Sequence, residues 1–166
     1  MVLVAAPDDY VARLASLGCQ FVPLTQLSRK GTNPIKDIRL YREFCAIYRQ
    51  IQPDIILHYT IKPNIYGTLA ARKVGIKSVA TVTGLGYTFL STGLVSRLAR
   101  LLYRYALKKA TRVIFQNNDD LQLFVKEKLI SAEKTMLVRG SGIDTAAFAP
   151  REKSISADKN SLMPLS

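Results

Sequence analysis

Short apolar runs alternate along the chain with longer segments in which apolar residues recur at helical spacing. The short runs predict strands at Val2–Ala6, Phe21–Leu24, Asp54–Tyr59, Ser78–Val82, Arg112–Phe115 and Thr135–Val138. Strands that alternate with helices are typical of an α/β domain, whose parallel strands are joined by right-handed crossovers. We therefore expect a doubly wound parallel sheet of the Rossmann-like class.

Two of these strands carry information about their place in the sheet. Pro23 has no N–H to give to a neighbouring strand, so Phe21–Leu24 favours an edge position. Asp54–Tyr59 is a continuous apolar run, which is typical of a parallel strand covered on both faces.

Capping residues and glycines set the expected limits of the helices. Asp8 or Asp9 caps a first helix that Gly18 ends, and Pro34 begins a second one. Thr60–Asn64 (TIKPN) is expected to be a loop. Further helices are predicted at Ile65–Val74, Leu94–Ala110 and Leu121–Leu129, with a capped turn at Asn117–Asp120.

The charge balance indicates an anionic partner. The chain of 166 residues carries 24 Lys and Arg against 12 Asp and Glu, a formal charge of +12. Such an excess suits a membrane surface, phosphates or nucleic acid, and a merely soluble basic protein is the alternative. Hydrophobic residues make up 48% of the chain, which indicates a globular domain.

Other features of the sequence limit the classes of protein. Cys19 and Cys45 lie far apart and read as small buried hydrophobic residues in a reducing compartment. No signal peptide is visible, and no apolar run approaches the length of a membrane span. No cluster of carboxylates or histidines suggests a metal site. We expect a cytoplasmic chain without a metal.

The stretch Thr81–Phe89 (TVTGLGYTF) joins a predicted strand to a basic helix. Gly84 and Gly86 allow a ligand to approach the backbone, Thr83 adds a hydroxyl and Tyr87 adds a stacking face. The longer Gly-x-Gly-x-x-Gly fingerprint is absent, so no dinucleotide site is expected. A plain turn from strand to helix is the alternative.

Polar side chains also follow the two neighbouring strands. His58, Thr60, Lys62 and Asn64 follow the strand before this joint, and Asn117–Asn118 follows the strand after it. The carboxyl ends of parallel strands meet at one edge of the sheet, so the three loops should converge into a sugar or phosphate site. His58 is either part of that site or a satisfied polar residue at the end of its strand.

The predicted helix Leu94–Ala110 has a basic face. Its basic stripe consists of Arg97, Arg100, Arg104 and Lys108, and its apolar side of Leu94, Leu98, Leu101, Leu102 and Tyr105. A helix of this kind suits docking on anionic lipid headgroups. A surface helix with a solvated basic face is the alternative.

Four segments resemble the N-terminal half of family 4 glycosyltransferases of the GT-B fold. They are QPDIILHYTIKPNIYGTLAARKVG, KSVATVTGLGYTF, RVIFQNNDDLQLF and RGSGIDTAAFAP, and they run from Gln52 to Pro150. The similarity is greatest to bacterial enzymes that extend sugars linked to a polyprenyl diphosphate.

The resemblance implies a domain organisation. Residues 1–150 would form an incomplete Rossmann-like N-terminal domain, residues 151–166 a linker or disordered tail, and the C-terminal donor-binding domain would be absent. The chain opens on what looks like the family's second strand. In such a sheet the first strand is central, so its absence leaves strand edges that pair directly, swap between chains or stay exposed. We therefore expect marginal stability or self-association.

The resemblance also implies a function, the acceptor-binding half of a retaining glycosyltransferase. The intact enzyme would move a sugar from a nucleotide-sugar, as co-substrate and without another cofactor, to a polyprenyl-diphosphate-linked glycan at the inner membrane face. Contacts with the acceptor would come from Thr60, Lys62 and Asn64, the cleft lining from Thr83, Gly84, Leu85, Gly86, Tyr87 and Asn117, and the hinge from Arg139, Gly140, Ser141 and Gly142.

The basic stripe Arg97, Arg100, Arg104 and Lys108 would hold the enzyme at the inner membrane as a peripheral protein. No catalytic residue is identified. Many family members carry a histidine where this chain has Thr83, whose hydroxyl is no base near neutral pH. The isolated chain is expected to be inactive, since catalysis needs both halves.

Three other functions stay open. A sugar-nucleotide epimerase of the same fold would need ionisable groups around the cleft. A non-catalytic membrane-binding module would bind lipid without the TGLG loop. A nucleic-acid binder would need aromatic residues among the basic ones, and only Tyr103 and Tyr105 stand there. We expect no nucleic-acid partner.

Overall fold

Helices and parallel strands alternate through the described part of the chain. The computed structural model describes residues 1–9, 11, 17–27, 33–84, 93–140, 142 and 144–145. The elements are β1 (Val2–Ala5), β2 (Gln20–Pro23), α2 (Pro34–Ile51), β3 (Ile55–Tyr59), η1 (Pro63–Gly67), α3 (Thr68–Val74), β4 (Lys77–Val82), α5 (Leu94–Leu107), β5 (Arg112–Phe115), α6 (Asn118–Lys126), η2 (Ala132–Lys134) and β6 (Thr135–Leu137). Every strand pair among them is parallel, which confirms the predicted α/β class. The first predicted helix and the predicted tail lie largely or wholly outside the described residues.

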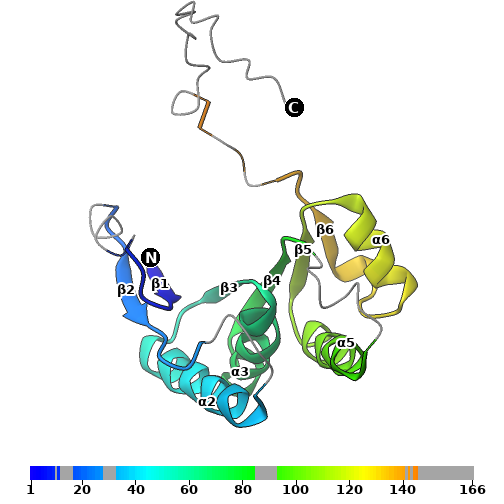
Figure 1. Ribbon diagram of the computed structural model, residues 1–166. Helices are drawn as coiled ribbons and strands as arrows, with labels where there is room; N and C mark the ends of the chain where they lie inside the picture. Colours follow the sequence, from blue (N-terminus) through cyan, green and yellow to red (C-terminus); the bar gives the residue numbers. More distant parts are fainter. Residues whose placement is uncertain are drawn as a thin grey trace, which may run out of the picture.

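The described strands form two separate sheets (Figure 1). One contains β1 and β2, and the other has the order β3-β4-β5-β6. Among these strands β2 pairs only with β1, as Pro23 predicts. β1 and β3 do not pair with each other, so each has one edge without a partner among the described strands. Of the three expected outcomes, direct pairing of β1 with β3 does not occur among the described strands.

The expectation that β3 is covered on both faces is wrong. Ile55, Leu57 and Tyr59 alternate along the strand and are each more than half exposed, at 52%, 56% and 52%. Ile56 and His58 point to the opposite face, where α2 and α3 lie. In Figure 1, the helices α2, α3 and α5 lie on the same side of the four-stranded sheet. The apolar run therefore reflects one packed face and one face that no described helix covers.

Two hydrophobic clusters connect the helices to the sheets. In α2, the side chains of Leu40, Phe44 and Ile47 recur at helical spacing and pack beside Ala70 and Ala71 of α3. The second cluster joins α5 and α6 to β4 and β5, and contains Val82, Tyr103, Ala106, Leu107, Val113, Phe115 and Phe124. The apolar faces of the helices thus fix them against the strands.

Side-chain caps explain where the helices begin. The Asn33 side chain accepts hydrogen bonds from the N–H groups of Ile35 and Lys36, at 3.1 and 3.2 Å. Asn117 caps α6 in the same way, because its Oδ1 accepts from the N–H of Asp120 at 2.8 Å. As a result α6 begins at Asn118, three residues earlier than predicted from the apolar spacing.

The segment predicted as the loop Thr60–Asn64 turns directly into helix. Thr60 has a positive φ of 67°, and the π-helix η1 then runs from Pro63 into α3. The N–H of Asn64 donates to the carbonyl of Thr60 at 3.0 Å. Sequence spacing did not reveal this early start because Pro63 reads as a helix breaker anywhere except in the first turn.

His58 is a satisfied core residue. Its Nε2 lies 2.8 Å from the hydroxyl of Tyr48, and its Nδ1 lies 3.2 Å from the hydroxyl of Thr68. A Cβ on Gly67 would come within 2.6 Å of the same Nε2, so only glycine fits there. Burial lowers the pKa of His58 from 6.5 to about 4. Of the two predicted roles of His58, the structure therefore favours the hydrogen-bonded residue at the end of its strand over a residue of the site.

Acidification should destabilise the fold through His58. His58 takes up a proton near pH 6.5 in the unfolded chain but only near pH 4 in the folded chain. The free energy of unfolding therefore keeps its full contribution from His58 above pH 6.5 and loses it as the pH falls from 6.5 to 4. Between pH 7 and pH 5 the loss from this group should be about 2 kcal/mol. Urea unfolding of wild type and His58→Gln at both pH values tests this. The variant should be less stable at pH 7 but should lose less on acidification, and equal losses would contradict the assignment.

The open edge of β3 should make the chain self-associate. An exposed apolar edge strand pairs with other chains, and a lysine on such a strand suppresses pairing. Leu57→Lys should therefore lower the concentration-dependent increase in sedimentation coefficient. Leu17→Lys is the matched control, since Leu17 is 72% exposed and lies outside the described strands. A wild-type chain that stays monomeric at high concentration would overturn this prediction.

Candidate functional site

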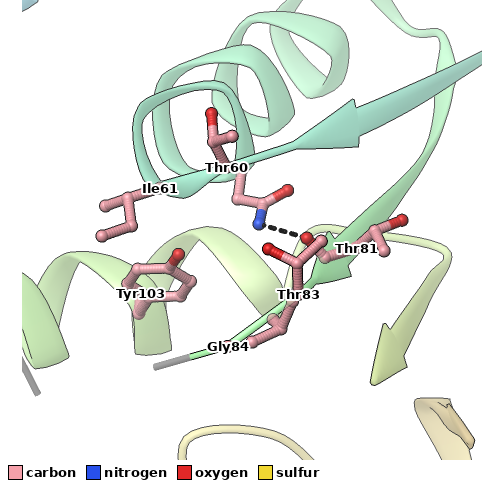
Figure 2. A pocket seen from close by; sticks show the side chains of 8 residues that line it. Thr60, Ile61, Thr81, Thr83, Gly84 and Tyr103 are labelled. Atoms are coloured by element: carbon pink, nitrogen blue, oxygen red, sulfur yellow. Dashed lines mark hydrogen bonds between the residues drawn. The ribbon is translucent and has the colours of Figure 1, made fainter. Parts of the chain in front are cut away.

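A small cavity lies at the carboxyl ends of β3 and β4, where the sequence predicts a site. Its volume is about 200 Å³. Figure 2 shows Thr60 and Ile61 on one side, Thr81, Thr83 and Gly84 at the end of β4, and Tyr103 on α5. Four residues of the predicted site thus lie together in the lining: Thr60, Asn64, Thr83 and Gly84. The remaining lining residues, which the site prediction did not include, are Ile61, Thr81, Val82 and Tyr103.

Asn64 joins the two strand ends. Its side chain is almost completely buried, with 1% exposed, and its Nδ2 donates to the carbonyl oxygen of Thr81 at 2.8 Å (dashed line in Figure 2). A carbonyl needs a donor, so this bond fixes which way the amide faces. Asn64 therefore forms part of the wall of the cavity, and its contact with an acceptor stays a prediction.

Lys62 has a different environment from the one predicted for a phosphate contact. Its Nζ lies 2.9 Å from Oδ1 of Asp37 on α2, and the hydroxyl of Tyr66 donates to Oδ2 at 2.9 Å. Burial, followed by the hydrogen bond with Asp37 and its charge, raises the pKa of Tyr66. Lys62 does not line the cavity. The sequence missed Asp37, which stands 25 residues away from its partner.

The described lining of the cavity is rich in hydroxyl groups and carries no charged side chain. Thr60, Thr81, Thr83 and Tyr103 supply the hydroxyls, and Thr60 and Thr83 are exposed. Burial raises the pKa of Tyr103, and a smaller effect of the Asn64 hydrogen bond opposes it. Tyr103 therefore keeps its proton at neutral pH. Neutral hydroxyls of this kind suit hydrogen bonds with sugar hydroxyls.

The other predicted site residues lie outside this lining or outside the described residues. Asn117 acts as the cap of α6, and its Nδ2 also donates to Oδ2 of Asp120 at 2.8 Å. Arg139, Gly140 and Gly142 are exposed after β6, and both glycines have positive φ. The predicted positions Leu85, Gly86, Tyr87 and Ser141 lie outside the described part of the chain.

The exposed face of α5 carries part of the predicted apolar side together with most of the basic stripe. Leu98, Leu101 and Tyr105 are exposed by 57%, 61% and 60%, whereas Tyr103, Ala106 and Leu107 are buried. Arg100 differs from the other residues of the basic stripe, because its guanidinium donates to both carboxylate oxygens of Glu127, at 3.0 and 3.1 Å. The exposed face therefore combines apolar side chains with the basic residues Arg97, Arg104 and Lys108.

The described residues also lack two features that would suggest other kinds of site. They contain no group of three His, Cys, Asp or Glu side chains that could hold a metal ion. None of the helices among them is long and apolar enough to cross a membrane.

The chain is similar to two curated bacterial enzymes. It is 27% identical over 153 residues to the N,N'-diacetylbacillosaminyl-diphospho-undecaprenol alpha-1,3-N-acetylgalactosaminyltransferase of Campylobacter jejuni, covering 89% of this chain and 40% of the relative. It is 27% identical over 137 residues to the UDP-Gal:alpha-D-GlcNAc-diphosphoundecaprenol alpha-1,3-galactosyltransferase of Escherichia coli, covering 78% of this chain and 35% of the relative. The chain thus spans less than half the length of either.

Solved structures support the fold. A glycosyltransferase from Rickettsia africae matches 91% of this chain and 37% of its own with a TM-score of 0.62, at 16% identity. MurG of Acinetobacter baumannii matches 87% of this chain and 37% of its own with a TM-score of 0.52, also at 16% identity. Residues 1–117 match the family described as "Glycosyl transferase 4-like", which is more than half of the 166 residues. The chain therefore belongs to the glycosyl transferase 4-like family, as the resemblance of its motifs predicts.

Proposed function

We propose that this chain is the acceptor-binding half of a retaining glycosyltransferase. The whole enzyme moves a sugar from a nucleotide-sugar to a glycan on a polyprenyl diphosphate, at the inner face of the membrane. The nucleotide-sugar is a co-substrate, and no further cofactor is required. The isolated chain does not turn over, because the donor must be held by a second half that closes on this one.

The two curated relatives support an acceptor role for this region. Their names give the same kind of acceptor, an N-acetylated sugar on a diphospho-undecaprenol, but different transferred sugars, N-acetylgalactosamine and galactose. The similarity covers 40% and 35% of their lengths. We infer that the region shared with this chain binds what the two reactions have in common, which is the acceptor. We also infer that the acceptor of this chain carries an N-acetylated sugar.

The hydroxyl-lined cavity is the observation that carries this proposal. It lies at the carboxyl ends of parallel strands, where ligands bind in open α/β sheets. Its 200 Å³ is less than the roughly 300–1,000 Å³ of a pocket for a whole drug-sized ligand, so it fits one sugar ring of a longer acceptor. We propose that the hydroxyl groups of Thr60 and Thr83, which line the cavity, bind hydroxyl groups of that ring.

The chemistry of the lining favours retention. Among the described residues that line the cavity, Tyr103 alone ionises, and burial raises its pKa. No group there takes a proton at neutral pH, so we infer that the leaving phosphate of the donor accepts the proton of the acceptor hydroxyl. The same lack of ionisable groups among the described lining disfavours the epimerase alternative, which needs an acid or base.

The exposed face of α5 supports docking on a membrane. Leu98, Leu101 and Tyr105 form an apolar stripe, and Arg97, Arg104 and Lys108 border it. An interfacial helix combines these two features, because the apolar residues enter the headgroup region while the cations bind phosphates. An acceptor carried on a polyprenyl chain resides in that membrane.

Loss of the Thr83 hydroxyl should weaken acceptor binding. Thr83→Val keeps the shape of the side chain and removes one hydrogen bond, so binding should fall about 2- to 10-fold. The measurement is cosedimentation of the chain with phosphatidylcholine vesicles that contain a polyprenyl-diphosphate N-acetylhexosamine, compared with vesicles without it.

Thr111→Val is the matched control, since Thr111 is exposed and lies outside the cavity. Its binding should equal that of wild type, and Thr83→Ser should retain most of it. Equal binding of wild type to both kinds of vesicle would refute the acceptor site. If Thr83→Val and Thr111→Val changed vesicle binding equally, Thr83 would not be part of the acceptor site.

A further inference from the structure

A second cavity lies beside the apolar stripe of α5. Its volume is about 370 Å³, and it separates α5 from the segment that joins α6 to η2. Arg104 of α5 and Lys108, the residue directly after this helix, line one side of it, and Lys128 and Ser131 line the opposite side. Arg104 and Lys108 belong to the basic stripe predicted for membrane docking, whereas Lys128 and Ser131 are not among the predicted site residues.

The cavity concentrates positive charge. Arg104, Lys108 and Lys128 are all exposed, and none has an ion-pair partner among the described residues. The nearby carboxylate of Glu127 is occupied by Arg100. No acidic side chain belongs to the described lining. Three cations around a small space attract a compact anion such as a phosphate group.

Lys128 occupies a position that normally favours glycine. It follows the last turn of α6 with a φ of 56°, and the N–H of Leu129 donates to the carbonyl of Phe124 at 2.9 Å. This is the Schellman arrangement, whose left-handed residue is usually Gly. A lysine strained in this way, with its side chain at a cationic cavity, points to a functional reason for its presence.

The cavity adjoins the surface proposed to dock on the membrane. Arg104 and Lys108 are three residues beyond Leu101 and Tyr105, so each cation neighbours an apolar residue of the stripe on the same helix. A phosphate held in the cavity would therefore lie next to side chains that enter the apolar edge of a bilayer.

We propose that Arg104, Lys108 and Lys128 form a phosphate-binding pocket that takes the headgroup phosphate of an anionic membrane lipid. This inference rests on the proposed docking of α5 on a membrane. The apolar stripe favours a lipid over a soluble phosphate ester, since a soluble ligand gains nothing from it. The pocket would add selectivity for anionic lipid to an otherwise general attraction.

Three variants test the pocket. Lys128→Gly removes the cation and the strained side chain together, so its melting temperature should rise by about 2–5 °C. Gln52→Gly relaxes another exposed residue with positive φ, 47°, at the end of α2 and leaves the pocket intact. Lys126→Ala removes an exposed charge on α6 outside the pocket.

Binding is measured by cosedimentation with phosphatidylcholine vesicles, with and without phosphatidylglycerol. Lys128→Gly should bind the phosphatidylglycerol vesicles about 5-fold less tightly despite its higher melting temperature. Gln52→Gly should gain stability and bind as wild type does. Lys126→Ala should lose no more than about 2-fold, because its charge acts only at long range.

Each other result overturns the inference in a distinct way. Equal losses for Lys128→Gly and Lys126→Ala would show that only the number of charges matters. If a low concentration of glycerol phosphate released the chain from the vesicles, the ligand of the pocket would be a soluble phosphate and not a lipid. If the chain bound duplex DNA as tightly as the vesicles, the ligand would be a nucleic acid. A wild-type chain that does not bind phosphatidylglycerol vesicles would refute the docking of α5 and the pocket together.

Discussion

The buried hydrogen bond from Asn64 to the carbonyl of Thr81 determines how the described site is assembled. It ties the start of η1 to the end of β4, at 2.8 Å and away from water, where an unpaired carbonyl would be costly. The same π-helix contacts α2, α3, α5 and β3. Around it, Gly67 makes room for His58, and Tyr66 binds Asp37. The cavity is therefore a consequence of how η1 is held in the core.

The strand edges, unlike the Thr81 carbonyl, have backbone groups without partners among the described strands. Backbone groups at a strand edge need partners, yet β1 and β3 each pair on one side only. The apolar residues Ile55, Leu57 and Tyr59 are exposed on the same strand. The cavity nevertheless depends on the carboxyl ends of β3 and β4, which pair with each other over five residues. The site can therefore form although the sheet is divided.

The sequence predicted those parts of the molecule that depend on local spacing. Strand positions, the helix start at Pro34, the capped turn at Asn117 and the convergence of Thr60 with Thr83 follow from neighbouring residues and parallel order. The ion pair of Lys62 with Asp37 did not, since it needs the packing of α2 against η1. Thr60–Asn64 was predicted to be a loop because proline hides a helix start. Exposure on β3 was missed because an apolar run does not show which helices are present.

The orientation of α5 connects the cavity at β3 and β4 to the surface that we propose docks on a membrane. The buried face of α5 combines the small residues Ser96 and Ala106 with Tyr103 and Leu107, whereas Leu98 and Leu101 are exposed. Leu98, Leu101 and Tyr105 belong to the predicted apolar side of the helix, and the structure leaves them exposed. Tyr103 on the inner face lines the cavity, and Leu101 and Tyr105 on the outer face remain exposed. One helix thus connects the proposed sugar site to the proposed membrane surface, an arrangement suited to an acceptor whose sugar and lipid belong to one molecule.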